Sequence, residues 1–224
     1  MNTQNCSTII ALFVRIPVPG RVKTRLASDL GNENACRLYR AMVSDILRNI
    51  EESGFPVYLF HDGADCGELP HEWVKASSGV IVQHGDSIGE RMATAFQHCF
   101  AENIAKVILV GSDIPGLDSQ VITEASDALE SHDVAIAPAA DGGYCLIALR
   151  RDIYQRNIFR NIPWSTGQVL HSTLERCTEC HLQVALLKQL LDIDTIHDIQ
   201  TYCKNPSAHA IATNICLEAA GFLL

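Results

Sequence analysis

The apolar run at residues 107–110 (VILV), which ends abruptly at a Gly-Ser-Asp113 sequence, constrains the fold more than any other stretch of this 224-residue chain. Its residues are apolar on both alternating faces, which is typical of a strand buried on both sides in a parallel sheet. Ligands of open α/β sheets bind just outside the carboxyl ends of the strands, so Asp113 is a candidate to touch substrate or metal. The alternative is that Asp113 only caps or hydrogen-bonds the turn that follows.

Other apolar segments alternate with helical patterns through the first two-thirds of the chain. Strands are predicted at 7–14, 55–60, 80–83, 107–110, 133–138, 144–149 and 182–187, and helices after residues 31, 87, 118, 166, 195 and 207. This order predicts an α/β fold with a mostly parallel sheet and helices on both faces. Because no repeat or linker interrupts the sequence, we expect residues 1–224 to form a single domain.

Charge and cysteine content narrow the class of protein. The formal net charge is −9, from 17 basic and 26 acidic residues, which argues against a nucleic-acid-binding surface. The nine cysteines are scattered and odd in number, which favours a reducing compartment over a disulfide framework. The first residues show no signal-peptide pattern, and no apolar run approaches the length of a membrane span. We therefore expect a cytoplasmic protein.

A cationic loop follows the first predicted strand at residues 17–25 (PVPGRVKTR). Gly20 lets the backbone approach a ligand closely. Arg21, Lys23 and Arg25 then supply three cations on alternating residues, which suits a phosphate or diphosphate group. The loop is neither a Walker nor a Rossmann motif. A solvated basic turn is the alternative interpretation.

A carboxylate that faces a cationic phosphate site suggests a divalent metal ion between the two. Magnesium and manganese prefer carboxylate oxygens together with substrate phosphates, so Asp113 is the candidate metal ligand. Such an ion would neutralise a leaving diphosphate. Asp192 and Asp194 are one residue apart and would face the same side of an extended segment. Either could complete the metal site, or both could be cap and surface charges.

Two further sets of residues are weaker candidates. The turn at 141–143 (DGG) presents Asp141 as an acceptor for a sugar hydroxyl or an attacking nucleophile, although a plain hairpin turn explains its glycines nearly as well. Gln83 and Arg91 lie near another strand end, where Arg91 could contact a phosphate or pair with a neighbouring acidic residue.

Taken together, these stretches resemble a known family. The motifs PxPGRVKTRL, QxGDxxGERM, GSDxPGL, PAxDGGYxL and PWST and the late DxDTxxD run are similar to those of a bacterial family of GT-A-type glycosyltransferases, which are related to nucleotide-diphospho-sugar transferases. The resemblance runs from about residue 8 to about residue 200. It implies a GT-A-like three-layer α/β/α sandwich with Asp113 in the place of the metal carboxylate. The full DxD of many glycosyltransferases is missing, since Gly111 and Pro115 flank Asp113 at two residues on either side.

The resemblance leaves two reactions open. The leading hypothesis is a glycosyl transfer from a nucleotide-diphospho-sugar with Mg²⁺ or Mn²⁺, in which Gly20, Arg21, Lys23, Arg25, Gln83 and Arg91 bind the nucleotide, Asp113 and Asp141 are catalytic, and Gly142, Gly143 and Trp164 face the sugar or acceptor. The same superfamily contains molybdenum-cofactor and phospholactate guanylyltransferases. A nucleotidylyltransferase that releases pyrophosphate is therefore the alternative, and a non-catalytic nucleotide-binding protein is a third. The sequence does not indicate an oligomeric state.

Overall fold

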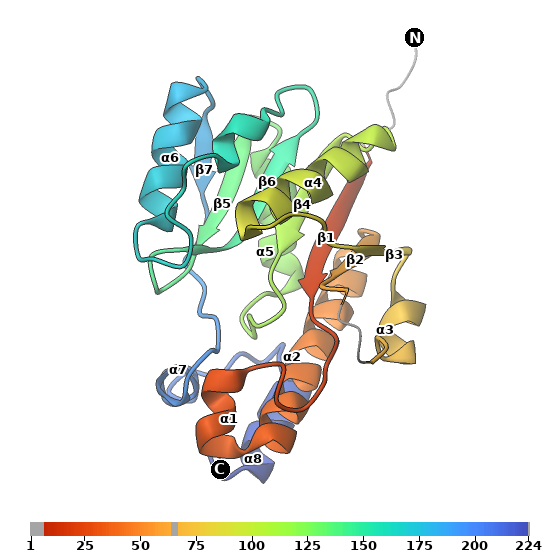
Figure 1. Cartoon of the computed structure of the whole chain (residues 1–224), viewed down its shortest axis with the longest axis vertical. Helices are drawn as coiled ribbons and strands as arrows, with labels where there is room; N and C mark the ends of the chain where they lie inside the picture. Colours follow the sequence, from red (N-terminus) through yellow and green to blue (C-terminus); the bar gives the residue numbers. More distant parts are fainter. Residues whose placement is uncertain (1–6, 64–66, 224) are drawn as a thin grey trace.

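The computed structural model describes residues 7–63 and 67–223 and contains one seven-stranded sheet (Figure 1). The strand order is β3-β2-β1-β4-β6-β5-β7. β6 is antiparallel to both of its neighbours, while every other pair is parallel. The strands are β1 (Thr8–Val14), β2 (Val57–His61), β3 (Gly79–Val82), β4 (Lys106–Val110), β5 (Val134–Pro138), β6 (Tyr144–Arg150) and β7 (Val184–Leu186).

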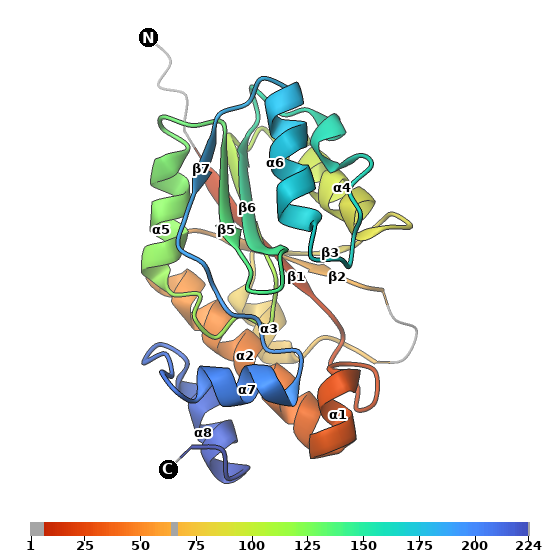
Figure 2. The same ribbon diagram turned by 90° about the vertical axis from the view of Figure 1, so that its left-hand side faces the viewer.

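Helices cover both faces of the sheet and make three layers, with α2 and α5 on one side and α4 and α6 on the other (Figure 2). The two short helices α1 and α7 lie beyond the carboxyl end of β1 (Figure 1). The helices are α1 (Thr24–Leu30), α2 (Asn32–Ser53), α3 (His71–Ala76), α4 (Ile88–Ala101), α5 (Ser119–Ala128), the 3₁₀ turn η1 (Arg156–Phe159), α6 (Val169–Glu179), α7 (Ile196–Tyr202) and α8 (Ile211–Ala219).

Successive side chains of β1 point to opposite faces of the sheet and are apolar on both, so helices must bury both faces. Ile10, Leu12 and Val14 pack into the core under α2 and α5. Ile9, Ala11 and Phe13 pack into a second core under α4. All seven residues of β1 are buried, as expected for a central strand of this kind.

The predicted α/β class and mostly parallel sheet are confirmed. All seven strands lie within about two residues of the predicted ranges, because continuous apolar runs mark doubly covered strands clearly. The helices α1 and α3 were not predicted, since each spans only two turns and has no amphipathic repeat. The predicted single domain over residues 1–224 stays a prediction.

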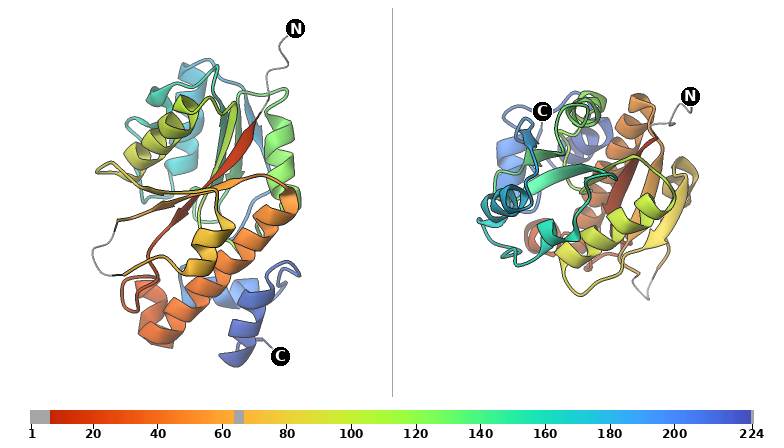
Figure 3. Two further views of the ribbon diagram at one scale, coloured as in Figure 1. Left: turned by 90° about the vertical axis from the view of Figure 1, so that its right-hand side faces the viewer. Right: turned by 90° about the horizontal axis from the view of Figure 1, so that it is seen from above.

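The C-terminal helix α8 packs against α2 (Figure 3). Asp45 of α2 is buried and accepts hydrogen bonds from the backbone amides of Ala212 (2.9 Å) and Thr213 (2.7 Å) in the first turn of α8. Arg48 pairs with the same carboxylate at 3.2 Å. This buried contact fixes the end of the chain to the body of the fold.

Within the described ranges, no helix combines the length and the apolar character that crossing a membrane requires.

Candidate functional site

Lys23 stands at the centre of the carboxyl edge of the sheet. Its Nζ donates to Asp113 Oδ2 at 2.7 Å and to Asp194 Oδ1 at 2.8 Å. Arg25 reaches the other oxygen of Asp194 at 3.4 Å. The loop after β1 delivers Lys23 at the start of α1 in the left-handed conformation, with φ 48°. Three segments that are far apart in the sequence are thus joined through one ammonium group.

Burial and the neighbouring charges shift the pKa of Lys23 in opposite directions. The Lys23 side chain is 5% exposed, which by itself lowers the pKa, but the charges of Asp113 and Asp194 outweigh burial and raise the pKa above its ordinary value. Burial likewise acts to raise the pKa of Asp194, and the charges of Lys23 and Arg25 bring it below its ordinary value. Lys23 and Asp194 therefore stay charged at neutral pH.

A polar cavity of about 350 Å³ opens beside this ion-pair network. Three cations line it: Arg15, Lys23 and Arg25. Tyr39 closes its floor, where its hydroxyl accepts from the Arg15 amide at 2.8 Å and lies 3.1 Å from Ser112 Oγ. Burial raises the pKa of Tyr39 to about 12, so the hydroxyl is neutral. We call this space the cationic cavity.

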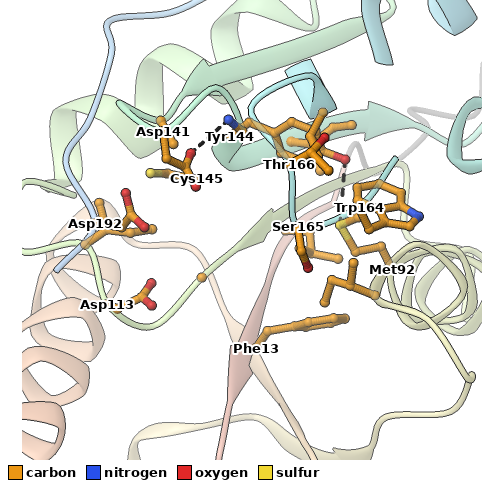
Figure 4. A pocket seen from close by; sticks show the side chains of 18 residues that line it. Phe13, Met92, Asp113, Asp141, Tyr144, Cys145, Trp164, Ser165, Thr166 and Asp192 are labelled. Carbon is orange, nitrogen blue, oxygen red and sulfur yellow. Dashed lines mark hydrogen bonds between the residues drawn. The ribbon is translucent and has the colours of Figure 1, made fainter. Parts of the chain in front are cut away.

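Asp113 also lines a second cavity, of about 250 Å³ (Figure 4). Asp113, Asp141 and Asp192 lie along one side of it, facing Met92 and Trp164 across the opening. Its walls are otherwise mostly apolar, with Phe13, Ile88, Leu109, Ile114, Tyr144, Cys145, Ile147 and Val169 among the lining residues. We call this space the apolar cavity. Asp113 lines both cavities.

Asp192 and Asp194 serve different cavities, although the sequence predicted a shared side. Asp192 lines the apolar cavity and Asp194 the cationic one. The residue between them donates its amide to the backbone oxygen of Asp113 at 2.9 Å, which fixes the segment across the end of β4. Burial, followed by the charge of Asp113 and smaller effects of Asp141 and Asp194, raises the pKa of Asp192 to about 6.

Two turns form the rim of the apolar cavity. Asp141 Oδ1 accepts the Gly143 amide at 2.8 Å, so the carboxylate stabilises its own turn. Gly142 has φ 89°, and a Cβ there would stand 2.3 Å from the Gly167 carbonyl oxygen, so the contact between the two turns requires glycine.

Trp164, in the second of these turns, packs over the start of α4. A Cβ on Gly89 would stand 2.5 Å from the Trp164 ring. The ring of Tyr144 meets Trp164 edge-on, with centroids 6.5 Å apart. The predicted Trp164 is therefore a wall of the apolar cavity.

Several predicted phosphate-binding residues lie outside both cavities. Gln83 donates to the Phe60 carbonyl at 2.7 Å. Arg91 donates to the Gly85 carbonyl at 3.0 Å rather than pairing with an acidic neighbour. Arg21 is exposed at the turn that Gly20 forms, and neither residue lines a cavity. Gly142 also lies just outside the lining of the apolar cavity, whereas Gly143 lines it.

Other lining residues were not predicted from the sequence. The position of Arg15 could have identified it as a site residue, because it directly follows β1 and is the first charged group at that strand end. Nothing in the sequence indicated Tyr39, which lies in the apolar stripe of a helix, or Phe13, which lies inside an apolar run. Ser165 lines the apolar cavity with φ 63°, which only the structure reveals.

The oxygen donors at this edge fit a divalent ion in one particular way. Among the residues described, no three Asp, Glu, His or Cys side chains are grouped closely enough to hold a metal ion. Asp113 and Asp192 nevertheless line the same cavity, and magnesium commonly binds through one or two carboxylates plus substrate phosphates. The residues therefore fit an ion that binds together with substrate.

Comparison with known structures identifies the fold. The chain is similar to a "putative nucleotide-diphospho-sugar transferase" from Desulfovibrio desulfuricans G20, with 33% identity over 97% of this chain and 98% of that one and a TM-score of 0.84. The fold is thus that of the nucleotide-diphospho-sugar transferases, as the sequence resemblance implied.

More distant structures share the fold alone. A CMP:2-keto-3-deoxy-manno-octonic acid synthetase complexed with CTP matches at 12% identity and a TM-score of 0.50, over 87% of this chain and 96% of that one. Rv0371c from Mycobacterium tuberculosis H37Rv, in complex with manganese, matches at 15% identity and a TM-score of 0.51, over 90% of this chain and all of that one (100%). These relatives bind CTP and manganese, respectively.

The family is shown by sequence as well. None of the curated proteins matches this chain. A family model described as "Uncharacterized protein conserved in bacteria (DUF2064)" matches residues 46–166, which is more than half of the sequence. The chain therefore belongs to the DUF2064 family of bacterial proteins, and it has the fold of a nucleotide-diphospho-sugar transferase.

Proposed function

We propose that this protein is a glycosyltransferase that uses a nucleotide-diphospho-sugar. The observation that carries the proposal is that Asp113 lines two cavities of opposite character. A donor whose diphosphate lies in the cationic cavity would present its sugar at Asp113. An acceptor in the apolar cavity would then meet the sugar from the other side.

The cationic cavity suits a diphosphate because its cations are held in place before the ligand arrives. Lys23 is fixed by two carboxylates and Arg25 by one. Arg15 lines the same cavity, and its backbone amide donates to the Tyr39 hydroxyl. One guanidinium group can donate two parallel hydrogen bonds to a phosphate, and a buried ammonium adds a strong point charge. Arg21, on the outside of the same loop, would add long-range attraction for an anionic ligand.

Asp113 and Asp192 would hold the divalent ion that arrives with the donor. Mg²⁺ or Mn²⁺ would supply charge stabilisation to the leaving diphosphate. Lys23 would remain at Asp113 Oδ2 and keep that carboxylate oriented. The distant similarity to a manganese-bound protein supports the choice of ion.

Catalysis by these residues would consist of positioning and electrostatics. Lys23 and Arg25 would stabilise negative charge that develops on the leaving group. Asp141, exposed at the rim of the apolar cavity, would accept a hydrogen bond or a proton from the attacking group. The rigid contact between Gly142 and Gly167 would keep that carboxylate in place.

Thermal unfolding tests donor binding. UDP-, GDP-, ADP- and TDP-sugars are added to the protein with and without Mn²⁺. We expect at least one donor to raise the Tm in the presence of Mn²⁺, and Lys23→Ala to abolish that increase. Lys75→Ala, on α3 and outside both cavities, is the matched control and should retain it. If no donor shifts the Tm of the unaltered protein, the proposal is wrong.

Nucleotidyl transfer is the second candidate, and the fold similarity to a CTP-bound synthetase favours it. Lys23 would then contact a triphosphate, and a phosphate acceptor would displace pyrophosphate. The products separate the two reactions, because glycosyl transfer releases a nucleoside diphosphate and nucleotidyl transfer releases pyrophosphate. A pyrophosphate assay with nucleoside triphosphates and sugar phosphates makes this comparison directly.

A further inference from the structure

The two cavities at Asp113 differ in their charge, and the difference restricts what each can bind. Three cations line the cationic cavity. The lining of the apolar cavity contains three carboxylates and no lysine, arginine or histidine. Lys23 reaches Asp113 from the cationic cavity, so in the absence of a divalent ion a phosphate or carboxylate group placed in the apolar cavity would face Asp141 and Asp192 with no cation in the lining.

The walls of the apolar cavity suit a small apolar group. Trp164, Tyr144 and Phe13 contribute ring surface, and Met92 adds an adaptable thioether. A cavity of about 150 Å³ lined by apolar residues is large enough for benzene. At about 250 Å³, this cavity has room for an aromatic ring, or a similar apolar body, with a short substituent.

Two carboxylates at the polar end of the cavity have little charge compensation from the protein. Asp192 forms no ion pair with any residue in the described part of the chain, and it is partly buried. Cys145, only 7% exposed, lies on the same side of the cavity. Asp141 uses one oxygen on the Gly143 amide, which leaves the other oxygen for a ligand. Buried or half-buried acceptors of this kind are normally satisfied by a donor.

We propose that the apolar cavity binds a small apolar molecule whose head group donates hydrogen bonds and carries no negative charge, either a protonated amine or a hydroxyl. The apolar body would lie against Trp164 and Phe13, and the head group would face Asp141 and, when no divalent ion is bound, Asp192. That this molecule is the acceptor rests on the proposed function. Its binding preference rests on the lining of the cavity in the absence of a divalent ion, and under that condition the cavity disfavours phosphate-bearing molecules such as sugar phosphates.

Three probes with one carbon skeleton test the preference: 2-phenylethylamine, 2-phenylethanol and phenylacetate. Calorimetry on the unaltered protein measures each Kd, once with EDTA and once with Mn²⁺. In EDTA we expect the amine to bind best, the alcohol to bind more weakly, and phenylacetate to bind at least about tenfold more weakly than the amine.

Fluorescence of Trp164 locates the binding event. The only other tryptophan, Trp73, is buried in the core on the α2 side of the sheet, so the Trp73→Phe protein reports on the apolar cavity alone. If that variant does not fold, calorimetry on the unaltered protein and on Asp192→Asn gives the same comparison. We expect Asp192→Asn to weaken the binding of the amine and to strengthen the binding of phenylacetate. Asp127→Asn, on the exposed face of α5, should change neither Kd.

Three outcomes would overturn the inference. In EDTA, phenylacetate could bind as tightly as the amine, Asp192→Asn could leave the Kd of both unchanged, or none of the three probes could bind. Each outcome is distinct from a failure of the proposed function, because donor binding in the cationic cavity is measured separately with nucleotide-sugars and the Lys23 variant.

Discussion

Lys23 Nζ lies 2.7 Å from Asp113 Oδ2 and thereby joins the loop after β1 to the carboxyl end of β4. The same ammonium group holds Asp194, which is 171 residues away in the sequence. The side chain of Asp113 is 31% exposed and that of Asp194 is 43% exposed, so solvent reaches the carboxylates but hardly the lysine. This arrangement positions a candidate metal ligand and a candidate phosphate ligand with one contact.

Replacement of Lys23 by methionine should reduce stability at neutral pH. It removes the cation paired with Asp113 and leaves Asp194 with Arg25 only, and we expect a loss of about 1–2 kcal/mol in the free energy of unfolding after allowance for the exposure of both carboxylates. Chemical denaturation measures this change. Lys75→Met serves as the control and should change stability by less than about 0.5 kcal/mol.

The loss caused by Lys23→Met should also depend on pH. The pKa of Asp194 lies below its ordinary 3.8 and that of Lys23 above its ordinary 10.5. The stabilisation is therefore present between these values. It disappears as pH falls below about 3.8, when Asp194 takes up a proton, and as pH rises above about 10.5, when Lys23 loses one. A loss of equal size at pH 3 and pH 7 would contradict an ionic origin.

Asp192→Asn should stabilise the protein at alkaline pH. Its pKa is raised from 3.8 to about 6, so the folded protein binds this proton more tightly than the unfolded chain does. Stability therefore falls as pH rises from about 4 to 6 and stays lower above that range. Because the group is only partly buried, we expect a gain of about 1 kcal/mol at pH 8 and none near pH 3.5. Denaturation curves at both pH values test this, with Asp127→Asn as the control.

Ser165→Gly should raise stability and change binding in the apolar cavity. Ser165 has φ 63°, a conformation that costs a side-chain-bearing residue more than it costs glycine. We expect a gain of about 0.5–1 kcal/mol in the free energy of unfolding. Ser165→Ala removes the same hydroxyl without relieving the backbone, so a gain of equal size in both variants would show that strain is not the cause.

Asp45→Asn should loosen the C-terminal helix without affecting the site. The carboxylate accepts two backbone amides of α8 and pairs with Arg48, and it is buried. We expect a loss of about 2–3 kcal/mol, since an amide replaces a charge in two charge-assisted hydrogen bonds. Hydrogen exchange should show the loss first at residues 211–219. Unchanged protection there would mean that other contacts hold α8.

The sequence predicted the sheet well because central strands such as β1 and β4 are apolar on both faces, and this pattern is local. It also predicted that Lys23, Arg25 and Asp113 meet, since parallel strands end at a common edge. It did not predict that Lys23 binds Asp194, because that contact depends on how a late loop crosses the edge. The sequence did not predict that the side chains of Gln83 and Arg91 donate to backbone carbonyl groups of the protein.

Calorimetric titration of nucleoside diphosphates tests directly whether Lys23 and Asp113 together bind the diphosphate of the nucleotide. UDP, GDP, CDP, ADP and TDP are titrated with Mn²⁺ into the unaltered protein, Lys23→Met and Asp113→Asn. We expect at least one of them to bind the unaltered protein, and both substitutions to weaken its binding by about tenfold or more. Absence of binding by all five, or equal binding by the unaltered protein and both variants, would contradict this expectation.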